Sequence, residues 1–264
     1  MAAINPSVLP ELSNKYIPGK HDPVGWYMSE KLDGVRAWWI DGKIYSREGH
    51  VFYPPEYFIE GFPTDIILDG ELYMGRGNFQ TCVGTVKRHV PTEAWKKVQF
   101  VVFDAPSVSA CFADRLLEAA KRIPVRNPHI RILDQIICTD TEHVNRMLIE
   151  IENNGGEGVM LRHPMSLYNI HGKRTSNVLK VKTMHDAEAV VIGHEPGKGR
   201  HEGRLGALLC TMEYTPTKKF KIGSGFTDEE RENPPEIGTV VSYRYFELTK
   251  SGIPRFPVFY RIRK

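Results

Sequence analysis

Apolar residues recur at helical spacing in two parts of the chain. Over residues 141–153 they follow the i, i+3, i+4, i+7 pattern and are followed by Gly155-Gly156, a stop signal. A similar stripe runs over residues 112–123. The positions that define the two stripes are Val144, Met147, Leu148 and Ile151, and Phe112, Leu116, Ala120 and Ile123. The pattern predicts an amphipathic helix at each place.

Most other apolar segments in residues 1–184 are short and rich in β-branched or aromatic residues, which is typical of strands. They are DIILDGELYM (65–74), VQFVVFD (98–104), EGVMLR (157–162) and VLKVK (178–182). Helices and strands together predict an α+β domain for residues 1–184.

The pattern changes after residue 184. Strand-like segments then follow one another, separated by turns with Gly or Pro, and only TDEERE (227–232) suggests a short helix. The segments are AEAVVIGHE (187–195), LGALLCTMEY (205–214), KFKIGSG (219–225), GTVVSYRYFELT (238–249) and PVFYRIR (257–263). Residues 185–264 therefore predict an all-β barrel of the OB-fold type. The alternative is a single continuous domain with a β-rich tail.

Composition is that of a globular protein, with 41% hydrophobic and 25% charged residues among 264. The net charge of +3 is too small to indicate a polyanionic partner by itself. Four cysteines stand far apart, which excludes a zinc finger of the common type and predicts free thiols. No segment approaches the length of a membrane span, and the first twenty residues lack a signal-peptide pattern. We expect an intracellular protein without membrane contact; a periplasmic protein whose leader was removed would look the same.

Basic residues gather locally between positions 162 and 185. This segment has five of them and no acid: Arg162, Lys173, Arg174, Lys180 and Lys182. Lys180 and Lys182 alternate on one strand, so both side chains point to the same face. Two adjacent ammonium groups repel unless an anion lies between them, and phosphate is the natural candidate. A solvated strand face remains the other interpretation.

The second domain also carries basic segments. Residues 244–264 have six basic residues against one acid, interleaved with aromatic residues, a pattern that suits a surface along a nucleic-acid backbone. The glycine-rich segment 193–206 lacks the Walker ending and predicts instead a hairpin connection that carries Lys198, Arg200 and Arg204.

Lys31 stands in the segment WYMSEKLDGVRAWW (26–39), which is otherwise mostly apolar. Such a lysine is paired, lies at a rim, or acts chemically. Glu30 and Asp33 are the partners that a structural lysine would have here, whereas desolvation by Trp26, Tyr27, Trp38 and Trp39 would favour a nucleophilic neutral amine. Carboxylates at strand ends, Glu71 and Glu157, predict a site for a divalent ion.

Taken in order, these segments resemble the motifs of the ATP-dependent DNA ligases, within the covalent nucleotidyltransferases. EKLDGVR resembles the nucleophile motif, SREG (46–49) the arginine motif after it, and LDGEL (68–72) the third motif. VVFDAP, GEGVMLR, LKVK and the C-terminal RFPVFYRIRK resemble the remaining motifs. The likeness covers nearly the whole chain and is greatest to the compact bacterial ligase E type.

The resemblance implies an adenylation (nucleotidyltransferase) domain followed by an OB-fold domain, and it implies roles for individual residues. Lys31 would attack ATP, with Asp33, Lys180 and Lys182 as further catalytic residues. Cofactor contacts would come from Arg36, Arg47, Glu71, Phe103, Lys180, Lys182 and Arg263, with Phe103 stacking on adenine. Glu157 and Glu71 would bind Mg²⁺ or Mn²⁺. The implied activity is nick sealing in duplex DNA through a lysyl-AMP and an adenylylated DNA intermediate.

The expected partner is nicked duplex DNA, bound by a monomer. No clamp-like insertion is seen, so we expect DNA to lie on open basic surfaces. The residues assigned to them are Lys87, Arg88, Lys173, Arg174, Lys198, Arg200 and Arg204, with Lys218, Lys219 and Lys221. The alternatives are an RNA ligase, a capping guanylyltransferase that uses GTP, and a nucleic-acid-binding module without catalysis.

Overall fold

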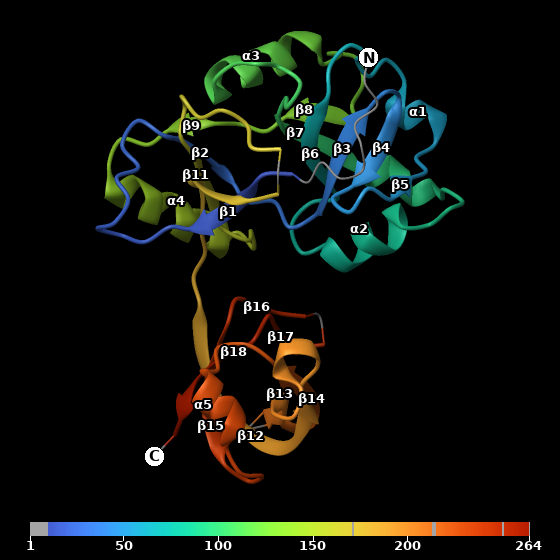
Figure 1. Cartoon of the computed structure of the whole chain (residues 1–264). Helices are drawn as coiled ribbons and strands as arrows, with labels where there is room; N and C mark the ends of the chain where they lie inside the picture. Colours follow the sequence, from blue (N-terminus) through green and yellow to red (C-terminus); the bar gives the residue numbers. More distant parts are fainter. Residues whose placement is uncertain (1–9, 171, 213–214, 250, 264) are drawn as a thin grey trace. The chain divides into compact units, whose positions relative to one another are not determined.

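The chain forms two compact units in a computed structural model that describes residues 10–170, 172–212, 215–249 and 251–263. The units are Met1–Lys182 and Thr183–Lys264, drawn in Figure 1. The division falls two residues before the boundary expected from the sequence. Residues 1–9, which belong to the segment without a signal-peptide pattern, lie outside the described residues.

One sheet of the first unit has the strand order β1-β11-β10-β2-β9. Its strands are β1 (Leu12–Lys15), β2 (Tyr27–Glu30), β9 (Ile136–Ile137), β10 (Val159–Arg162) and β11 (Arg174–Val181). The first strand pairs in parallel with β11, and the other pairs are antiparallel. Helix α4 (Thr141–Asn153) packs against β10 and closes the core of this sheet.

Another sheet of this unit has the order β5-β4-β3-β6-β7-β8. Its strands are β3 (Val35–Ile40), β4 (Lys43–Ser46), β5 (Val51–Phe52), β6 (Leu68–Tyr73), β7 (Gln99–Asp104) and β8 (Ile130–Ile132). The helices of this region are α1 (Glu56–Ile59), α2 (Phe79–Val86), η1 (Glu93–Lys97) and α3 (Phe112–Arg122). Trp39, Phe58, Trp95 and Phe100 fill the core between this sheet and its helices.

Both helices predicted from the apolar stripes are confirmed. Helix α4 has the predicted bounds because its apolar stripe faces the sheet and Asp140 caps its first turn by accepting from the backbone N–H of His143. Gly155 follows with a φ of 77°, a conformation that ends the helix. Helix α3 ends at Arg122, one residue before its predicted end.

The second unit is a sheet of order β14-β13-β12-β15-β18. Its strands are β12 (His185–Pro196), β13 (Leu205–Met212), β14 (Thr215–Ile222), β15 (Val240–Tyr245) and β18 (Val258–Ile262). A bridge from Ser224 to Val258 brings the end beyond β14 to β18, which curls the sheet toward a barrel. The remaining elements are η2 (Gly199–His201), α5 (Asp228–Glu232), β16 (Glu247–Leu248) and β17 (Pro254–Arg255).

The glycine-rich segment 193–206 is the predicted hairpin connection, since it joins the antiparallel strands β12 and β13. The segment 238–249 was expected to be one strand, and it is divided into β15 and β16. The two pair with different partners, β15 with β12 and β18, and β16 with β17. A change of pairing partner within one apolar segment leaves no mark on its hydrophobic pattern.

The four cysteines carry free thiols, as predicted. Within the described ranges, no helix is both long and apolar enough to cross a membrane.

Candidate active site

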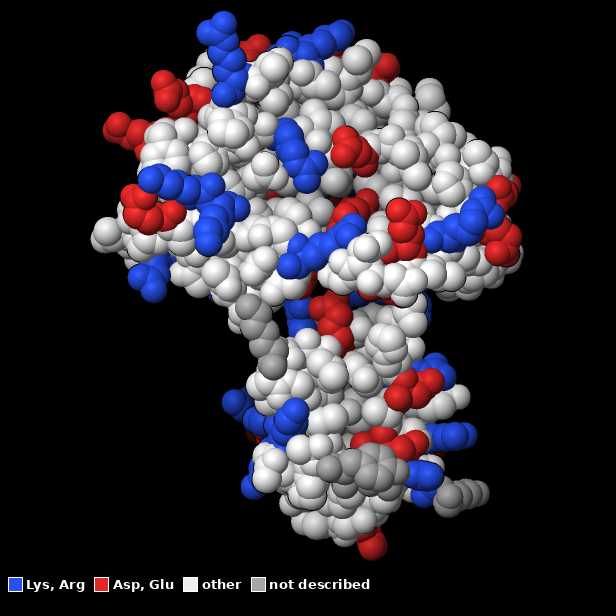
Figure 2. All heavy atoms as spheres, turned by 180° about the vertical axis from the view of Figure 1, so that it is seen from behind, with Lys and Arg blue, Asp and Glu red and all other residues white. Residues whose placement is uncertain are grey.

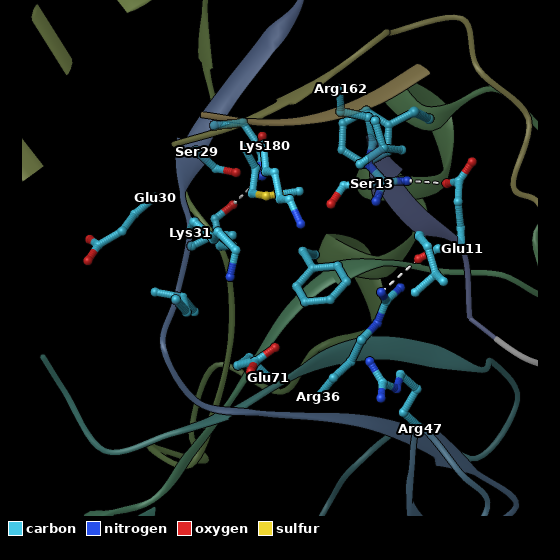
Figure 3. A pocket seen from close by; sticks show the side chains of 18 of the residues that line it. Glu11, Ser13, Ser29, Glu30, Lys31, Arg36, Arg47, Glu71, Arg162 and Lys180 are labelled. Atoms are coloured by element: carbon cyan, nitrogen blue, oxygen red, sulfur yellow. Dashed lines mark hydrogen bonds and ion pairs between the residues drawn. The ribbon is translucent and has the colours of Figure 1, made fainter. Parts of the chain in front are cut away.

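A cavity of about 310 Å³ in the first unit is lined by residues of both sheets. Lys31 follows β2 and Lys180 lies on β11, whereas Arg36, Glu71 and Phe103 lie on β3, β6 and β7. Figure 3 shows the side chains of Lys31, Lys180 and Arg36 directed toward the same space. The cavity thus contains residues that the sequence analysis assigned to one site, although Lys31 and Lys180 are 149 positions apart in the chain.

Lys31 is paired, and its partner is Glu157 rather than Glu30 or Asp33. The ammonium nitrogen of Lys31 lies 2.6 Å from one carboxylate oxygen of Glu157, and that of Lys182 lies 2.7 Å from the other. The carboxylate therefore lies between Lys31 and Lys182, a different pair from the Lys180 and Lys182 between which the sequence predicted an anion.

The turn that carries Glu157 is held tightly to the nucleophile segment. The backbone N–H of Lys31 donates to the carbonyl of Gly158 over 2.8 Å. A Cβ on Gly158 would lie 2.3 Å from the carbonyl oxygen of Val181, and its φ is 150°. Only glycine fits this close approach. The spacing between Lys31 and Glu157 is consequently fixed, although Lys31 lies just after β2 and Glu157 lies just before β10.

The aromatic setting expected for Lys31 is wrong. The cavity lining does not include the four aromatic residues nearest to it in sequence, Trp26, Tyr27, Trp38 and Trp39. Trp39 packs edge-on against Phe62 in the core, at 5.1 Å between ring centres. The aromatic rings that do line the cavity are those of Phe103 and Phe112. Alternation along β3 turns Trp39 to the face opposite Arg36, into the core. Trp38 shares the face of Arg36 but packs edge-on against Tyr168, at 6.3 Å between ring centres.

Arg36 is held by the Asp69 carboxylate and by the backbone of Glu11. Its guanidinium makes two hydrogen bonds to the Asp69 carboxylate, at 3.0 and 2.6 Å, and a third to the backbone oxygen of Glu11 at 2.7 Å. Burial disfavours its charge, but Asp69 more than offsets this and raises the pKa of Arg36. The guanidinium carbon lies 5.4 Å from the ring centre of Phe103. A fixed cation thus stands beside the ring expected to hold a purine.

Glu71 is an acid in an unfavourable position. Burial raises its pKa to about 8, opposed by the charges of Lys31 and Arg36 and reinforced by Glu157 and Asp69. Burial also lowers the pKa of Lys180, and Arg174, Lys31 and Lys182 add repulsion. The cavity lining thus contains more basic than acidic side chains, and the pKa of Glu71 within it is raised.

This raised pKa predicts a pH-dependent stability. The unfolded chain loses the Glu71 proton near pH 4.5 and the folded protein near pH 8, so ionisation favours unfolding increasingly as pH rises through this window. Glu71→Gln removes the effect. We expect its melting temperature, without nucleotide or metal, to exceed that of the wild type by about 4 °C at pH 8 and to match it at pH 4.5.

Thermal unfolding across this pH range tests the prediction. Glu60→Gln, on an exposed position, is the matched control and should show no such trend. If the difference in melting temperature between Glu71→Gln and wild type stays constant with pH, the prediction is wrong.

Asp33, Arg47 and Arg263 lie in different surroundings. Arg47 lines the cavity but is exposed and pairs with Glu48 at 2.9 Å. Asp33 is half-buried, and its charge adds to the burial that raises the pKa of Tyr73 to about 12. Arg263 is an exposed residue of the second unit, where its backbone N–H donates to the carbonyl of Val240.

The residues assigned to DNA are mostly exposed, with two qualifications. Arg174 lines the cavity and donates to the carbonyl of Ser13. Arg204 is largely covered and lies 3.2 Å from Asp228 and 3.6 Å from Glu232 on α5. The exposed members are Lys87, Arg88, Lys173, Arg174, Lys198, Arg200, Lys219 and Lys221. Figure 2 shows basic and acidic side chains interspersed on the face that it presents.

Arg200 and Arg204 therefore make a test pair. Arg204→Glu places a third acid against Asp228 and Glu232 and should destabilise the second unit by about 1–2 kcal/mol. Arg200→Glu, on an exposed side chain, should leave stability within about 0.5 kcal/mol. Urea unfolding measures the stability of both variants. Equal stabilities would contradict the structural role of Arg204.

Sequence reasoning missed a buried charge network that reaches the cavity wall at Glu11 and Arg162. Asp104 accepts from Arg115, at 2.6 and 3.0 Å, and from Arg162 at 2.7 Å. Arg162 also bonds to Glu11, and burial raises the pKa of Glu11. One signal was available: Arg115 stands on the buried side of α3, where a charge requires a partner.

Two models of known protein families match this chain. Residues 13–182 match the model of the ATP dependent DNA ligase domain, and residues 196–263 match that of the DNA ligase OB-like domain. The chain belongs to the ATP-dependent DNA ligase family.

Individual relatives agree with this assignment. The DNA ligase of Haemophilus influenzae is 40% identical over 242 residues, which cover 91% of this chain and 87% of that protein. A solved Lig E DNA ligase superposes with a TM-score of 0.88 at 32% identity, covering 97% of this ligase and 99% of that chain. The DNA ligase of Sulfophobococcus zilligii is 32% identical over 80% of this chain, which is 37% of its own length. The predicted fold, an adenylation domain followed by an OB-fold domain, and the predicted enzyme class are confirmed.

Proposed function

We propose that this ATP-dependent DNA ligase seals nicks between a 3′-hydroxyl and a 5′-phosphate in duplex DNA, with Lys31 as the residue that receives AMP. The observation that carries the proposal is the cavity in which Lys31 stands together with Lys180, Arg36 and Phe103, with Glu157 paired to the Lys31 amine. A primary amine beside several fixed cations suits attack on a phosphate ester.

In the first step, the Lys31 nitrogen attacks the α-phosphorus of ATP. A nitrogen–phosphorus bond forms, the bond from phosphorus to the bridging oxygen breaks, and pyrophosphate leaves with that electron pair. The amine must first lose a proton, and the Glu157 carboxylate at 2.6 Å is placed to take it or to pass it to water. AMP then moves to the 5′-phosphate of the nick, and the 3′-hydroxyl displaces it.

The cavity residues supply charge and position for these steps. Arg36 and Lys180 would hold phosphate oxygens, because both line the cavity with Lys31. Lys182 would add its charge from beside them, since it bonds to the same carboxylate as Lys31. Phe103 offers a ring face to adenine, with the Arg36 guanidinium already fixed next to it. Arg47 lines the cavity from an exposed position and would contact ATP there, whereas Arg263 belongs to the second unit and stays a proposed ATP contact.

The carboxylates fit a magnesium ion. Glu71 and Glu157 interact electrostatically, and the described residues contain no group of three or more His, Cys, Asp or Glu arranged for a metal. A pair of carboxylates suits Mg²⁺, which completes its shell with water and substrate phosphates, and Mn²⁺ accepts the same ligands. When bound, the ion would neutralise charge that develops on the transferring phosphate.

A labelling and sealing experiment tests the proposal. The protein is incubated with α-labelled ATP and Mg²⁺, and label on the protein is measured; nicked DNA is then added and sealing is followed. GTP in place of ATP, and a nicked RNA duplex in place of DNA, are the comparison arms. Label from GTP alone, or sealing of RNA alone, would replace this proposal by the guanylyltransferase or RNA ligase interpretation.

A further inference from the structure

An arginine outside the cavity connects the segments that carry its reactive groups. Arg76 follows β6 and makes two hydrogen bonds to the Glu30 carboxylate, at 2.8 Å from Nε and 2.9 Å from Nη2. Its Nη1 donates to the backbone oxygen of Asn154 over 3.3 Å. Asn154 begins the turn that leads to Glu157, and Glu30 immediately precedes Lys31. One guanidinium thus contacts both segments.

The turn that presents Arg76 is shaped for this position. Gly75 and Gly77 flank it with φ values of 86° and 71°, in the left-handed region that favours glycine. The side-chain amide of Asn78 donates to the carbonyls of Met74 and Arg76, both at 3.2 Å. The arginine is therefore placed by its own backbone and not only by its partner.

Glu30 is equally confined. It is the last residue of β2 and pairs with Val159 of β10. A Cβ on Gly156 would lie 2.9 Å from its carboxylate oxygen, so the carboxylate rests directly on the turn before Glu157. Figure 3 shows the Glu30 side chain extending away from that of Lys31. Glu30 consequently acts on Lys31 through the backbone, not through its charge.

These contacts cross from one sheet to the other. Arg76 follows β6, which carries Glu71, whereas Glu30 ends β2 in the other sheet and Asn154 lies in the turn between α4 and β10 of that sheet. Since the cavity lies between residues of both sheets, this bridge sets the distance between its walls at the end where the amine stands.

We propose that Arg76 is a positioning residue for adenylylation, which holds Lys31 and Glu157 in register with Glu71 by bonding to Glu30 and Asn154. This inference rests on the proposed function. Misplacement of a reacting group by about 1 Å can reduce a rate by about 100-fold. Arg76 itself does not line the cavity, so ATP binding does not depend on it.

The test is single-turnover labelling of Arg76→Met, Arg76→Lys and Glu30→Gln with α-labelled ATP, without DNA. We expect the rate of label uptake by Arg76→Met to fall about 10- to 100-fold, with the ATP concentration for half-maximal rate unchanged within about twofold. A lysine can bond to the Glu30 carboxylate through its single nitrogen but cannot also reach Asn154. The labelling rate of Arg76→Lys should therefore lie between those of Arg76→Met and the wild type. The double variant Arg76→Met/Glu30→Gln should be no slower than Arg76→Met.

Arg122→Met is the matched control. Arg122 has the same 35% side-chain exposure as Arg76 and also bonds to carboxylates, those of Glu118 and Asp65, but on α3 and away from the cavity. Its loss should change the melting temperature about as much as the loss of Arg76, with the labelling rate within about twofold of wild type. Equal loss of labelling in both variants would overturn the inference.

A DNA contact is the rival role for an arginine exposed to this degree. In that case Arg76→Met would bind nicked DNA more weakly and take up label at the wild-type rate, which would overturn the inference and leave the proposed function intact. Failure of the wild-type protein to take up any label would instead reject the proposed function.

Discussion

We expect Lys31→Ala protein to take up no label from α-labelled ATP and Mg²⁺. Alanine has no nitrogen to bond to phosphorus, and among the described residues no other amine bonds to the same Glu157 oxygen. Lys182 contacts the same carboxylate but comes from the far side of it, and Lys180 lies on the adjacent wall. The loss in labelling rate should be about 10⁴-fold or more, the size typical of a removed nucleophile. Label is counted on denatured protein.

The same variant provides its own control. Sealing of a nick that already carries AMP on its 5′-phosphate does not use the Lys31 nitrogen as nucleophile, so Lys31→Ala should retain much of that activity. Label at the wild-type level on Lys31→Ala would refute the assignment. Loss of both reactions together with a lowered melting temperature would mean that the substitution disturbs the fold around Glu157.

Nick binding should weaken steeply with salt. If five of the exposed basic residues assigned to DNA each neutralise a phosphate, and each adds about 0.9 to the slope of log affinity against log salt, affinity should fall roughly 500-fold between 50 and 200 mM. Labelling by ATP should change far less, because ATP binds within a cavity and displaces no condensed layer of counterions. Fluorescence titration of nicked DNA at several salt concentrations measures the slope.

Arg200→Glu should reduce the slope by about one and lower affinity at low salt, without lowering the melting temperature. Arg204→Glu is the contrasting variant, since its charge is already engaged by α5. A slope near zero for the wild-type protein would show that DNA is held by contacts other than these basic side chains.

The local features of this fold could be read from the sequence. Helix α4 was predictable because its apolar stripe, its cap and its glycine stop agree with one another. The cavity was predictable for a different reason: Lys31, Glu71, Glu157 and Lys180 carry a motif set, although no local pattern says that they meet.

Contacts that depend on distant pairing could not be read. Trp38 packs on Tyr168 and Trp39 on Phe62, and these tertiary contacts are not specified by hydrophobic alternation along β3. The same holds for Glu11, whose burial follows from the pairing of β1 with β11. Arg76 was missed because an arginine between two glycines resembles any surface turn.

The pairing of β1 with β11 also governs when the enzyme can first become active during its synthesis. Leu12 pairs with Arg174, so the first described strand must wait for a partner made more than 160 residues later. At about 5–20 residues per second, that delay is roughly 10–30 s. Glu11 and Ser13, which form part of the cavity wall, remain without their final neighbours throughout this time. A chain still on the ribosome can therefore build the six-strand sheet, but it acquires a complete nucleotide cavity only after β11 has emerged.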